Sequence, residues 1–407
     1  MSGERIYEGV FAVHKPQGVT SADVLRHLQK HFDHSETFRP WIEEEKRRRQ
    51  QDPNWQRKRK RKKQAPVQVK IGHGGTLDPL ATGVLVTGVG RGTKYLNSFL
   101  ESTKTYETVI LFGAETDTYD CLGKVVRRAP YEHITREVVE SALGAFRGKI
   151  LQRPPIFSAL RVQGKRLYEY AREGIEPPVD IKAREVDVHD LRILEWYPPG
   201  THEYRWPETE LAGDEKAVAE KLLDKDAAVP LAYSEAEADS NNVTVPPADV
   251  DAGADVDANA DDSKGKKRKS PPPASDCDAA AESEQQKKAK MDSTAEPKES
   301  SSTTAQPESS EENKPDQSQP TPSPPAVKIS MTVSSGFYVR SFAHDLGKAV
   351  GSCGLMSSLV RSRQWNYVLE PDKVLEYEDL EKGEEVWGPK VRRFLEEWQR
   401  KHPVDTK

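Results

Sequence analysis

Residues 72–83 read GHGGTLDPLATG and contain a single acidic side chain, that of Asp78. Glycine allows positive φ and a close approach of the backbone to a ligand. Pro79 fixes the chain directly after Asp78 and disfavours helix at that position. An acidic group on such a stiff loop is held in place, which suits a catalytic carboxylate, although a turn or a helix cap would explain the same residues. From the loop alone, both interpretations stay open.

The segments on both sides of this loop predict an α+β domain. Apolar and alternating patterns indicate strands over residues 9–14, 84–89, 105–112, 186–196 and 327–333. Helical spacing follows the cap candidates Thr20 and Ser21 and recurs over residues 94–100, 138–146 and 167–172. Residues 337–340 are expected to form a short strand with Tyr338 and Arg340 on the same face. Because strands and helices do not alternate regularly, we expect a central mixed or antiparallel sheet flanked by helices.

A long polar segment divides the folded chain. The protein has 407 residues, of which 35% are hydrophobic and 31% charged, and its formal net charge is -5. Residues 234–328 contain no Leu, Ile, Phe, Tyr or Trp, so they cannot offset the entropy cost of folding. We therefore expect a disordered, mainly acidic insertion over residues 211–326, which separates a catalytic domain into residues 1–210 and 327–407.

Two stretches are strongly basic. Residues 37–66 form a basic insertion that contains EEEKRRRQ and RKRKRKK, and residues 264–269 read KGKKRK. The charged run from residue 43 to residue 63 is not expected to bury a face, so a solvated loop or helix is one interpretation of it. A phosphate-binding arm or a nuclear-import signal is the other. The clusters favour a nuclear protein with an import receptor as partner, and further cytoplasmic or mitochondrial pools stay open.

Cysteine and hydropathy patterns exclude several classes. The three cysteines stand far apart, without a CxxC pair or a Cys/His cluster, so neither a disulfide framework nor a metal site is expected. The chain has no apolar run of the roughly 20 residues that a membrane-spanning helix needs. An intracellular protein without a membrane partner is therefore expected.

Six stretches together resemble one family. Residues 72–85 are similar to the catalytic motif of TruB-type pseudouridine synthases. The other five stretches occur in the family's order. They are its Lys-Pro motif at residues 9–21 (GVFAVHKPQGVTS), its Lys-X-Tyr strand at 104–107 (KTYE), its Thr-Asp loop at 113–123 (GAETDTYDCLG), its Pro-X-X-Ser-Ala segment at 154–174 (PPIFSALRVQGKRLYEYAREG) and its Tyr-X-Arg segment at 336–347 (GFYVRSFAHDLG). The resemblance extends from residue 9 to about residue 364.

This resemblance implies a pseudouridine synthase fold with the catalytic loop in a cleft. It implies that Asp78 is the nucleophile, that Arg340 pairs with Asp78, and that Tyr106 packs against the target base. Pseudouridine formation is a redox-neutral isomerisation, so no cofactor and no metal are expected. An ionised carboxylate in a closed pocket also requires a fixed cation beside it, and a planar guanidinium suits that role.

Further residues are implied as substrate contacts. Tyr338 matches a tyrosine of the substrate pocket, and Leu359 aligns with an apolar residue over the base, although Val360 departs from the family pattern. His73 resembles a histidine that contacts the RNA. Lys15 is expected to be structural or RNA-facing. Lys94, together with Arg91, is a candidate phosphate contact.

The resemblance also implies a substrate, namely the T-arm of tRNA with uridine 55 as the target. Messenger-RNA stem-loops that mimic a T-arm are further candidates, and a monomer is expected. Too little chain follows Gln364 for the PUA domain that other members carry. We therefore favour a stand-alone tRNA enzyme over a guide-RNA-dependent rRNA enzyme, with an RNA-binding tRNA-folding chaperone as the alternative from another class. Whether Asp78 attacks C1′ or C6 stays open.

Overall fold

Most of the strands that the sequence predicts join one ten-stranded sheet in the computed structural model of the protein. Along the sheet the order is β14-β1-β3-β12-β4-β11-β10-β7, with β13 paired to β12 and β2 to β3. The pairs β1/β14 and β3/β12 are parallel, whereas β1/β3, β12/β4, β4/β11, β11/β10 and β10/β7 are antiparallel. The expected mixed sheet and the α+β class are confirmed.

The structure describes residues 5–51, 66–226 without residues 159, 174, 176 and 180, and 323–403. These residues all belong to one unit, Met1–Val256 with Pro322–Lys407. The basic run 57–63 and residues 227–322 of the predicted insertion, with the KGKKRK cluster, lie outside the described residues.

The strands of the large sheet are β1 (Gly9–Lys15), β2 (Ile71–His73), β3 (Thr82–Val89), β4 (Lys104–Phe112), β7 (Gly148–Gln152), β10 (Arg184–Tyr197), β11 (Ala326–Val333), β12 (Gly354–Gln364), β13 (Tyr367–Val368) and β14 (Leu375–Glu376). Two small hairpins are β5 (Ala114–Thr116) with β6 (Val125–Arg128), and β8 (Arg161–Val162) with β9 (Lys165–Arg166).

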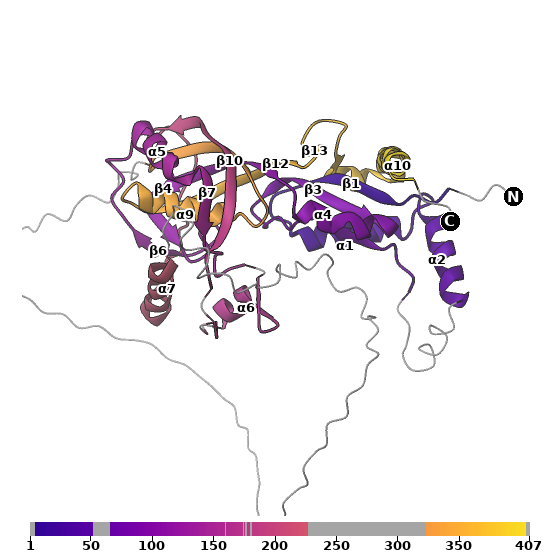
Figure 1. The fold of residues 1–407 in the computed structure, drawn as a ribbon, viewed down its shortest axis with the longest axis horizontal. Helices are drawn as coiled ribbons and strands as arrows, with labels where there is room; N and C mark the ends of the chain where they lie inside the picture. The colour runs from indigo at the N-terminus through magenta and orange to yellow at the C-terminus, as the bar shows by residue number, and fades with distance from the viewer. Residues whose placement is uncertain are drawn as a thin grey trace, which may run out of the picture. The chain divides into compact units, whose positions relative to one another are not determined.

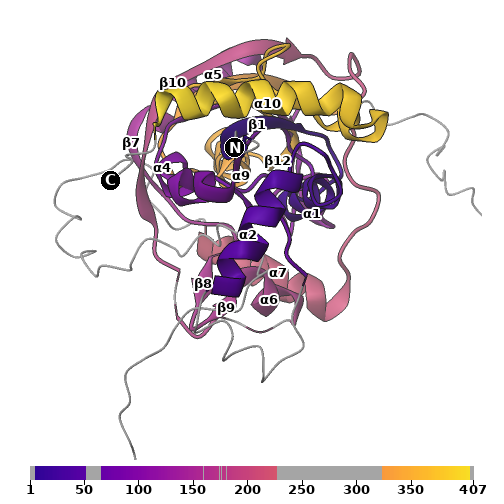
Figure 2. The ribbon, with the colours of Figure 1, turned by 90° about the vertical axis from the view of Figure 1, so that its right-hand side faces the viewer.

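The helices are α1 (Ser21–Phe32), α2 (Arg39–Gln51), α4 (Leu96–Leu100), α5 (Arg136–Leu143), α6 (Leu167–Arg172), α7 (Gly213–Asp226), α9 (Val339–Ala349) and α10 (Glu384–Lys401). Three 3-10 helices are η1 (Gly90–Tyr95), η2 (Gly144–Phe146) and η3 (Tyr377–Lys382). Figure 1 shows α1, α4 and α10 beside β1 and β3, whereas α5 and α9 lie beside β4, β7 and β10. In Figure 2, α10 runs across β1.

Helix α1 forms as its sequence predicts. Thr20 is the N-cap, and its hydroxyl accepts a hydrogen bond from the backbone N–H of Asp23. Val24, Leu25 and Leu28 recur at helical spacing and are buried in the main core. This packing fixes the first turn of α1 beside the Asp78 loop.

The first half of the predicted basic insertion is folded. Trp41 and Ile42 of α2 are buried, as is Phe38 directly before it, so these apolar side chains form one face against the core. Glu45 is also buried and pairs with Arg49 at 2.8 Å. The run expected to bury no face begins at residue 43, and within its described part, residues 43–51, only Glu45 is buried. The apolar residues just before the run anchor the helix, so the described part of the run is helical and mostly solvated.

Two other boundaries differ from the expectation. The chain continues as α7 beyond residue 211, and Leu211 and Leu223 pack with Tyr119 and Val126. The predicted insertion therefore begins with a folded helix. The predicted strand over residues 337–340 is also wrong, because Tyr338 is the N-cap of α9 and Arg340 lies in its first turn. The reason is that the buried apolar pattern of α9 already begins at Val339.

Among the described residues, no helix combines the length and apolar character that crossing a membrane requires. Cys121 and Cys353 are free thiols, and Cys277 lies outside the described part of the chain. Burial raises the pKa of Cys121 to about 11, and the charge of Asp120 adds to this.

Trp387 should be a principal support of the core around α1 and α10. Its side chain is almost fully buried and its ring lies 5.2 Å from that of Phe32. We expect Trp387→Ala to lower the free energy of unfolding by about 3–5 kcal/mol in chemical denaturation. The matched control is Trp365→Ala, because Trp365 is 48% exposed, and its effect should stay below about 1 kcal/mol. Equal losses in the two variants would contradict the assignment of this core.

Candidate active site

The Asp78 loop is held by polar contacts from several parts of the chain. Ser21 of α1 bonds both backbone groups of Leu77, with its Oγ donating to the carbonyl at 3.0 Å and accepting from the N–H at 2.8 Å. The backbone N–H groups of Gly18 and Gly74 donate to the carbonyls of Pro79 and Val86, each at 2.8 Å. The loop backbone is therefore fixed on both sides of Asp78.

Lys15 holds the same loop through contacts with backbone carbonyls. Its side chain is fully buried, and Nζ donates to the carbonyls of Pro16 at 2.8 Å, Val19 at 2.6 Å and Pro79 at 3.5 Å. Burial lowers the pKa of Lys15 to about 8, against the opposing charge of Asp78. Of the two roles expected for Lys15, its burial and contacts favour the structural one.

Arg340 forms the central ion pair of the site. Its Nε donates to Asp78 Oδ2 at 2.9 Å and its Nη2 lies 3.4 Å from Oδ1, which is a fork-like contact. The remaining donors reach the carbonyls of Thr118, from Nη1 at 3.1 Å, and of Phe157, from Nη2 at 3.0 Å. The Arg340 side chain is only 8% exposed, whereas that of Asp78 is 35% exposed. The expected pairing of these two residues is confirmed.

A second carboxylate, that of Asp120, also lies close to this guanidinium. Its Oδ2 is 3.9 Å from Arg340 Nε, and its Oδ1 accepts from Thr118 Oγ1 at 2.7 Å and from the backbone of Leu122 at 3.0 Å. Burial raises the pKa of Asp120, and the charge of Arg340 opposes that shift. Burial also acts to lower the pKa of Arg340, but Asp78 and Asp120 outweigh it and raise the pKa.

Sequence reasoning assigned no role to Asp120, although it lies in the GAETDTYDCLG stretch. The available signal was that this stretch holds two aspartates within four residues, beside a segment that resembles part of an active site. Its neighbour Tyr119 adopts φ of 65°, a region that few non-glycine residues occupy. This turn directs the Asp120 carboxylate towards Arg340.

Arg361 of β12 is a further residue that sequence reasoning missed. It is buried, and it donates from Nε to the carbonyl of Val84 at 2.8 Å and from Nη2 to that of Gly75 at 3.0 Å. Burial lowers the pKa of Arg361, and a hydrogen bond and charge interaction with Tyr106 oppose this. Tyr106 of β4 stands opposite Arg361 in the sheet register and is itself buried. Arg361 thus connects the candidate tyrosine with the glycine-rich loop.

Gly83 allows the strands under the loop to come this close. It pairs with Arg361 between the parallel strands β3 and β12, and its φ is +107°. A Cβ at this position would lie 2.3 Å from the carbonyl oxygen of Arg361, so any side chain would push the two strands apart.

Tyr338 lies next to the ion pair but not on a strand. Gln152 Nε2 donates to its carbonyl at 3.0 Å and Gln152 Oε1 accepts from its N–H at 2.8 Å. Its ring lies 5.3 Å from the guanidinium carbon of Arg184, whose Nη2 donates to the hydroxyl at 3.4 Å. The expected common strand face with Arg340 is wrong, because the helix begins between the two residues.

The remaining candidates occupy different surroundings. His73 on β2 and Leu359 on β12 are buried side chains of the sheet. Lys94 is exposed on η1, which follows the end of β3 that is remote from Asp78. Arg91 pairs with Glu8 at 3.0 Å. The structure therefore joins Asp78 with Arg340 directly and Tyr106 with the loop through Arg361, but it does not bring Lys94 to them.

The Asp78–Arg340 pair is suited to nucleophilic attack by the carboxylate. A carboxylate that is held by a buried guanidinium stays ionised and keeps its orientation, and an ionised carboxylate can attack an electrophilic carbon. Because Asp78 is partly exposed while Arg340 is buried behind it, a molecule that arrives from solvent meets the carboxylate first. That the loop lies in a cleft stays a prediction.

Comparisons with known proteins give consistent results. The model of the TruB family pseudouridylate synthase (N terminal domain) matches residues 59–207. tRNA pseudouridine synthase 4 of Schizosaccharomyces pombe is 40% identical over 381 residues, which are 91% of this chain and 82% of that protein. The Saccharomyces cerevisiae protein of the same name is 31% identical over 96% of this chain and 85% of its own length. Pseudouridylate synthase TRUB1 of Mus musculus is 44% identical over 47% of this chain and 51% of its own length.

The Arg361 contacts yield a prediction about the loop. Arg361→Lys keeps the charge but loses the planar fork that bonds Gly75 and Val84, so a buried cation and two carbonyls lose partners. We expect the free energy of unfolding to fall by about 2–4 kcal/mol in urea denaturation. Arg363→Lys on the same strand is the control, and it should cost less than about 1 kcal/mol because Arg363 is only partly buried. Similar values for both variants would rule out a special role for the Arg361 fork.

Proposed function

The chain belongs to the TruB family and is a tRNA pseudouridine synthase, and from this premise we propose that it isomerises uridine 55 in the T-loop of tRNA with Asp78 as the nucleophile. The observation that carries the proposal is the ion pair between Asp78 and Arg340 on the glycine-rich loop. The pair supplies an ionised, oriented and partly exposed carboxylate, which is the group that the reaction requires.

The reaction moves one bond of the nucleotide. The C1′–N1 bond breaks, the uracil turns, and a new bond forms between C1′ and C5. The proton on C5 leaves and N1 gains one, so atoms and electrons balance without an oxidant or a reductant. Asp78 attacks either C1′ of the ribose or C6 of the base, and its departure in a later step regenerates the carboxylate.

Arg340 and Tyr106 have distinct parts in this proposal. Arg340 places a positive charge beside Asp78 and fixes the direction of its carboxylate through two contacts, and the burial of Arg340 supports this role. Tyr106 packs against the target base and accepts or relays the C5 proton. Its position opposite Arg361, which holds the loop, supports that assignment.

The target uridine must leave its stack to reach Asp78. Unstacking costs a few kcal/mol and costs least in a loop, so a T-loop is a suitable substrate. Tyr338, beside the ion pair and over Arg184, is the best supported of the proposed contacts with the extruded nucleotide. His73 and Leu359 are proposed to line the inner wall behind the base, whereas the exposed Lys94 is proposed to contact phosphate farther along the RNA.

The proposal also covers the oligomeric state, further substrates and nuclear import. The enzyme acts as a monomer, and stem-loops of messenger RNA that mimic a T-arm are further substrates. The basic cluster at residues 264–269, outside the described residues, supports nuclear import.

Asp78→Asn tests the nucleophile. The amide keeps the shape of the side chain but removes the attacking charge, so pseudouridine formation should fall by at least roughly 1,000-fold. Affinity for tRNA should stay within a few-fold, because the loop and the proposed RNA contacts remain. The measurements are pseudouridine yield in a single-turnover assay and tRNA binding by filter retention. Asp190→Asn, at an exposed strand position, is the control and should leave both unchanged. Turnover near the wild-type rate in Asp78→Asn would refute the assignment.

Substrate choice is tested with purified protein and no other RNA. We expect one pseudouridine in an unmodified tRNA transcript and in its isolated T-arm hairpin, and none in a transcript with cytidine in place of uridine 55. Binding should weaken with added salt, because phosphate contacts release counterions. Conversion of neither RNA, together with tight tRNA binding, would instead support the chaperone or the guide-dependent alternative.

A further inference from the structure

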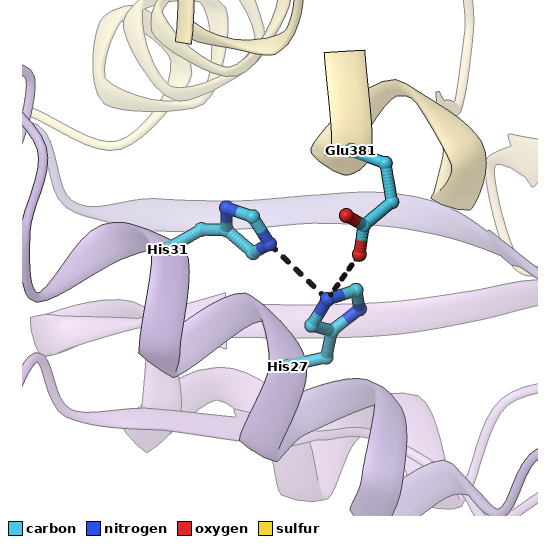
Figure 3. A group of neighbouring side chains, drawn as sticks. All are labelled: His27, His31 and Glu381. Atoms are coloured by element: carbon cyan, nitrogen blue, oxygen red, sulfur yellow. Dashed lines mark hydrogen bonds and ion pairs between the residues drawn. The ribbon is translucent and has the colours of Figure 1, made fainter. Parts of the chain in front are cut away.

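Two histidines of α1 project from one face of the helix. His27 and His31 are four residues apart in the stretch HLQKH, a spacing that places both side chains on the same side of a helix. Their Nε2 atoms lie 3.1 Å from each other. Figure 3 shows the His31 ring and the carboxylate of Glu381 meeting at His27. Glu381 lies in η3, 350 positions farther along the chain than His31.

Glu381 closes the group from a separate element. Its Oε1 lies 2.9 Å from His27 Nε2, and one ligand atom from each of the three residues lies within 4.8 Å of the others. Among the described residues, this is the one group of His, Cys and acidic side chains with such spacing. The separated cysteines predict no metal site, whereas the i, i+4 histidine pair is the signal in the sequence that points to this group.

The position of η3 is fixed independently of these side chains. The buried Asp379 pairs with Lys382 at 3.0 Å and with Lys390 at 2.7 Å. Glu384, just after η3, accepts from the backbone N–H of Thr37 at 2.7 Å. The Tyr377 ring lies 5.1 Å from that of His27. Glu381 is therefore brought to the histidines by the packing of the surrounding chain.

Hydrogen bonding alone does not satisfy this cluster. His27 Nε2 has two polar neighbours at hydrogen-bond distance, a second imidazole nitrogen and a carboxylate oxygen, but it carries at most one hydrogen. If that hydrogen is directed to Glu381, His27 Nε2 has no lone pair with which to accept a hydrogen bond from His31. If His27 Nε2 instead accepts from His31, its lone pair faces the carboxylate of Glu381. A single cation would instead accept a lone pair from all three atoms.

We propose that His27, His31 and Glu381 bind one Zn²⁺ ion, which links α1 to η3. Two imidazoles and one carboxylate form a donor set that zinc uses, with a fourth position left for water. Bond lengths of about 2.0–2.1 Å in a tetrahedron separate neighbouring ligand atoms by about 3.3 Å. The two distances from His27 Nε2, 3.1 and 2.9 Å, are close to this value, and the third pair, His31 with Glu381, lies within 4.8 Å. Mg²⁺ and Ca²⁺ prefer oxygen ligands, so they are excluded as occupants.

The site is separate from Asp78 but shares an element with it. Ser21, at the first residue of α1, bonds the catalytic loop, and His27 lies six residues later, or about 9 Å along the helix. A metal at this place would fasten the helix that supports the loop to the C-terminal part of the chain. The inference does not depend on the proposed uridine target.

The test measures zinc uptake by the full chain after treatment with a chelator. The wild type should take up one equivalent of Zn²⁺ in competition with a chromophoric chelator, and Zn²⁺, but not Mg²⁺, should raise its melting temperature. His31→Gln and Glu381→Gln should each weaken binding at least tenfold, since changes to residues that only orient a ligand already cost about 10- to 100-fold. His34→Gln is the matched control, because His34 is an exposed histidine next to α1 whose Nδ1 contacts the carbonyl of Lys30.

Glu381→Gln keeps the test decisive if a histidine variant folds poorly. The Glu381 side chain is 72% exposed, so its replacement should not unfold the protein, and the melting temperature in chelator should equal that of the wild type. The proposal would be overturned if the wild type does not take up zinc, or if Glu381→Gln and His31→Gln take up as much zinc as the wild type. Loss of uptake in both variants but not in His34→Gln would support it.

Discussion

The burial of one guanidinium organises this protein. A buried cation costs several kcal/mol unless each of its donors finds an acceptor, and the donors of Arg340 find theirs on Asp78, Thr118 and Phe157. These acceptors come from three loops that are far apart in the sequence. The first turn of α9 can bury Arg340 only if all three loops are in place, so the ion pair and the surrounding fold depend on each other. Asp120 places a second negative charge beside the guanidinium. The positive charge of Arg340 is therefore compensated even though its partner Asp78 is partly exposed to solvent.

The Asp78 loop has little regular structure, and side chains replace the hydrogen bonds that a strand or a helix would supply. Ser21 binds Leu77, Lys15 binds Pro79, and Arg361 binds Gly75. Each of these side chains is buried, so an unpaired carbonyl in their place would be costly. The contacts explain how a stretch rich in glycine, which alone would be mobile, holds an aspartate in one orientation. Preorganisation of this kind suits the proposed reaction, in which Asp78 acts on a base that has left its stack.

Segments near both ends of the chain also support the loop. Helix α1 carries Ser21 at one end and the two histidines farther along. Elements near the C-terminus pack against it, with Tyr377 of η3 beside His27 and Trp387 of α10 beside Phe32. The polar links between these elements, Glu384 to Thr37 and Glu381 to His27, join segments that are more than 340 residues apart in sequence. Support for the active loop therefore comes from both ends of the chain, and the long polar segment between residues 227 and 322 interrupts the sequence without separating the parts that must pack.

The sequence by itself determined the α+β class and the course of most strands and helices, because apolar periodicity is a local property. The pairing of Asp78 with Arg340 was implied by the resemblance of its motifs to those of the family. Only the tertiary structure decided the boundaries of α2, α7 and α9, where burial of Trp41, Leu223 and Val339 outweighs charged or strand-like neighbours. It also revealed Asp120 and Arg361, whose importance lies in partners far along the chain, and it gave Lys15 a buried position under the loop. The meeting of His27 and His31 with Glu381 was likewise invisible in sequence, since spacing along a helix predicts a common face but not what packs against it.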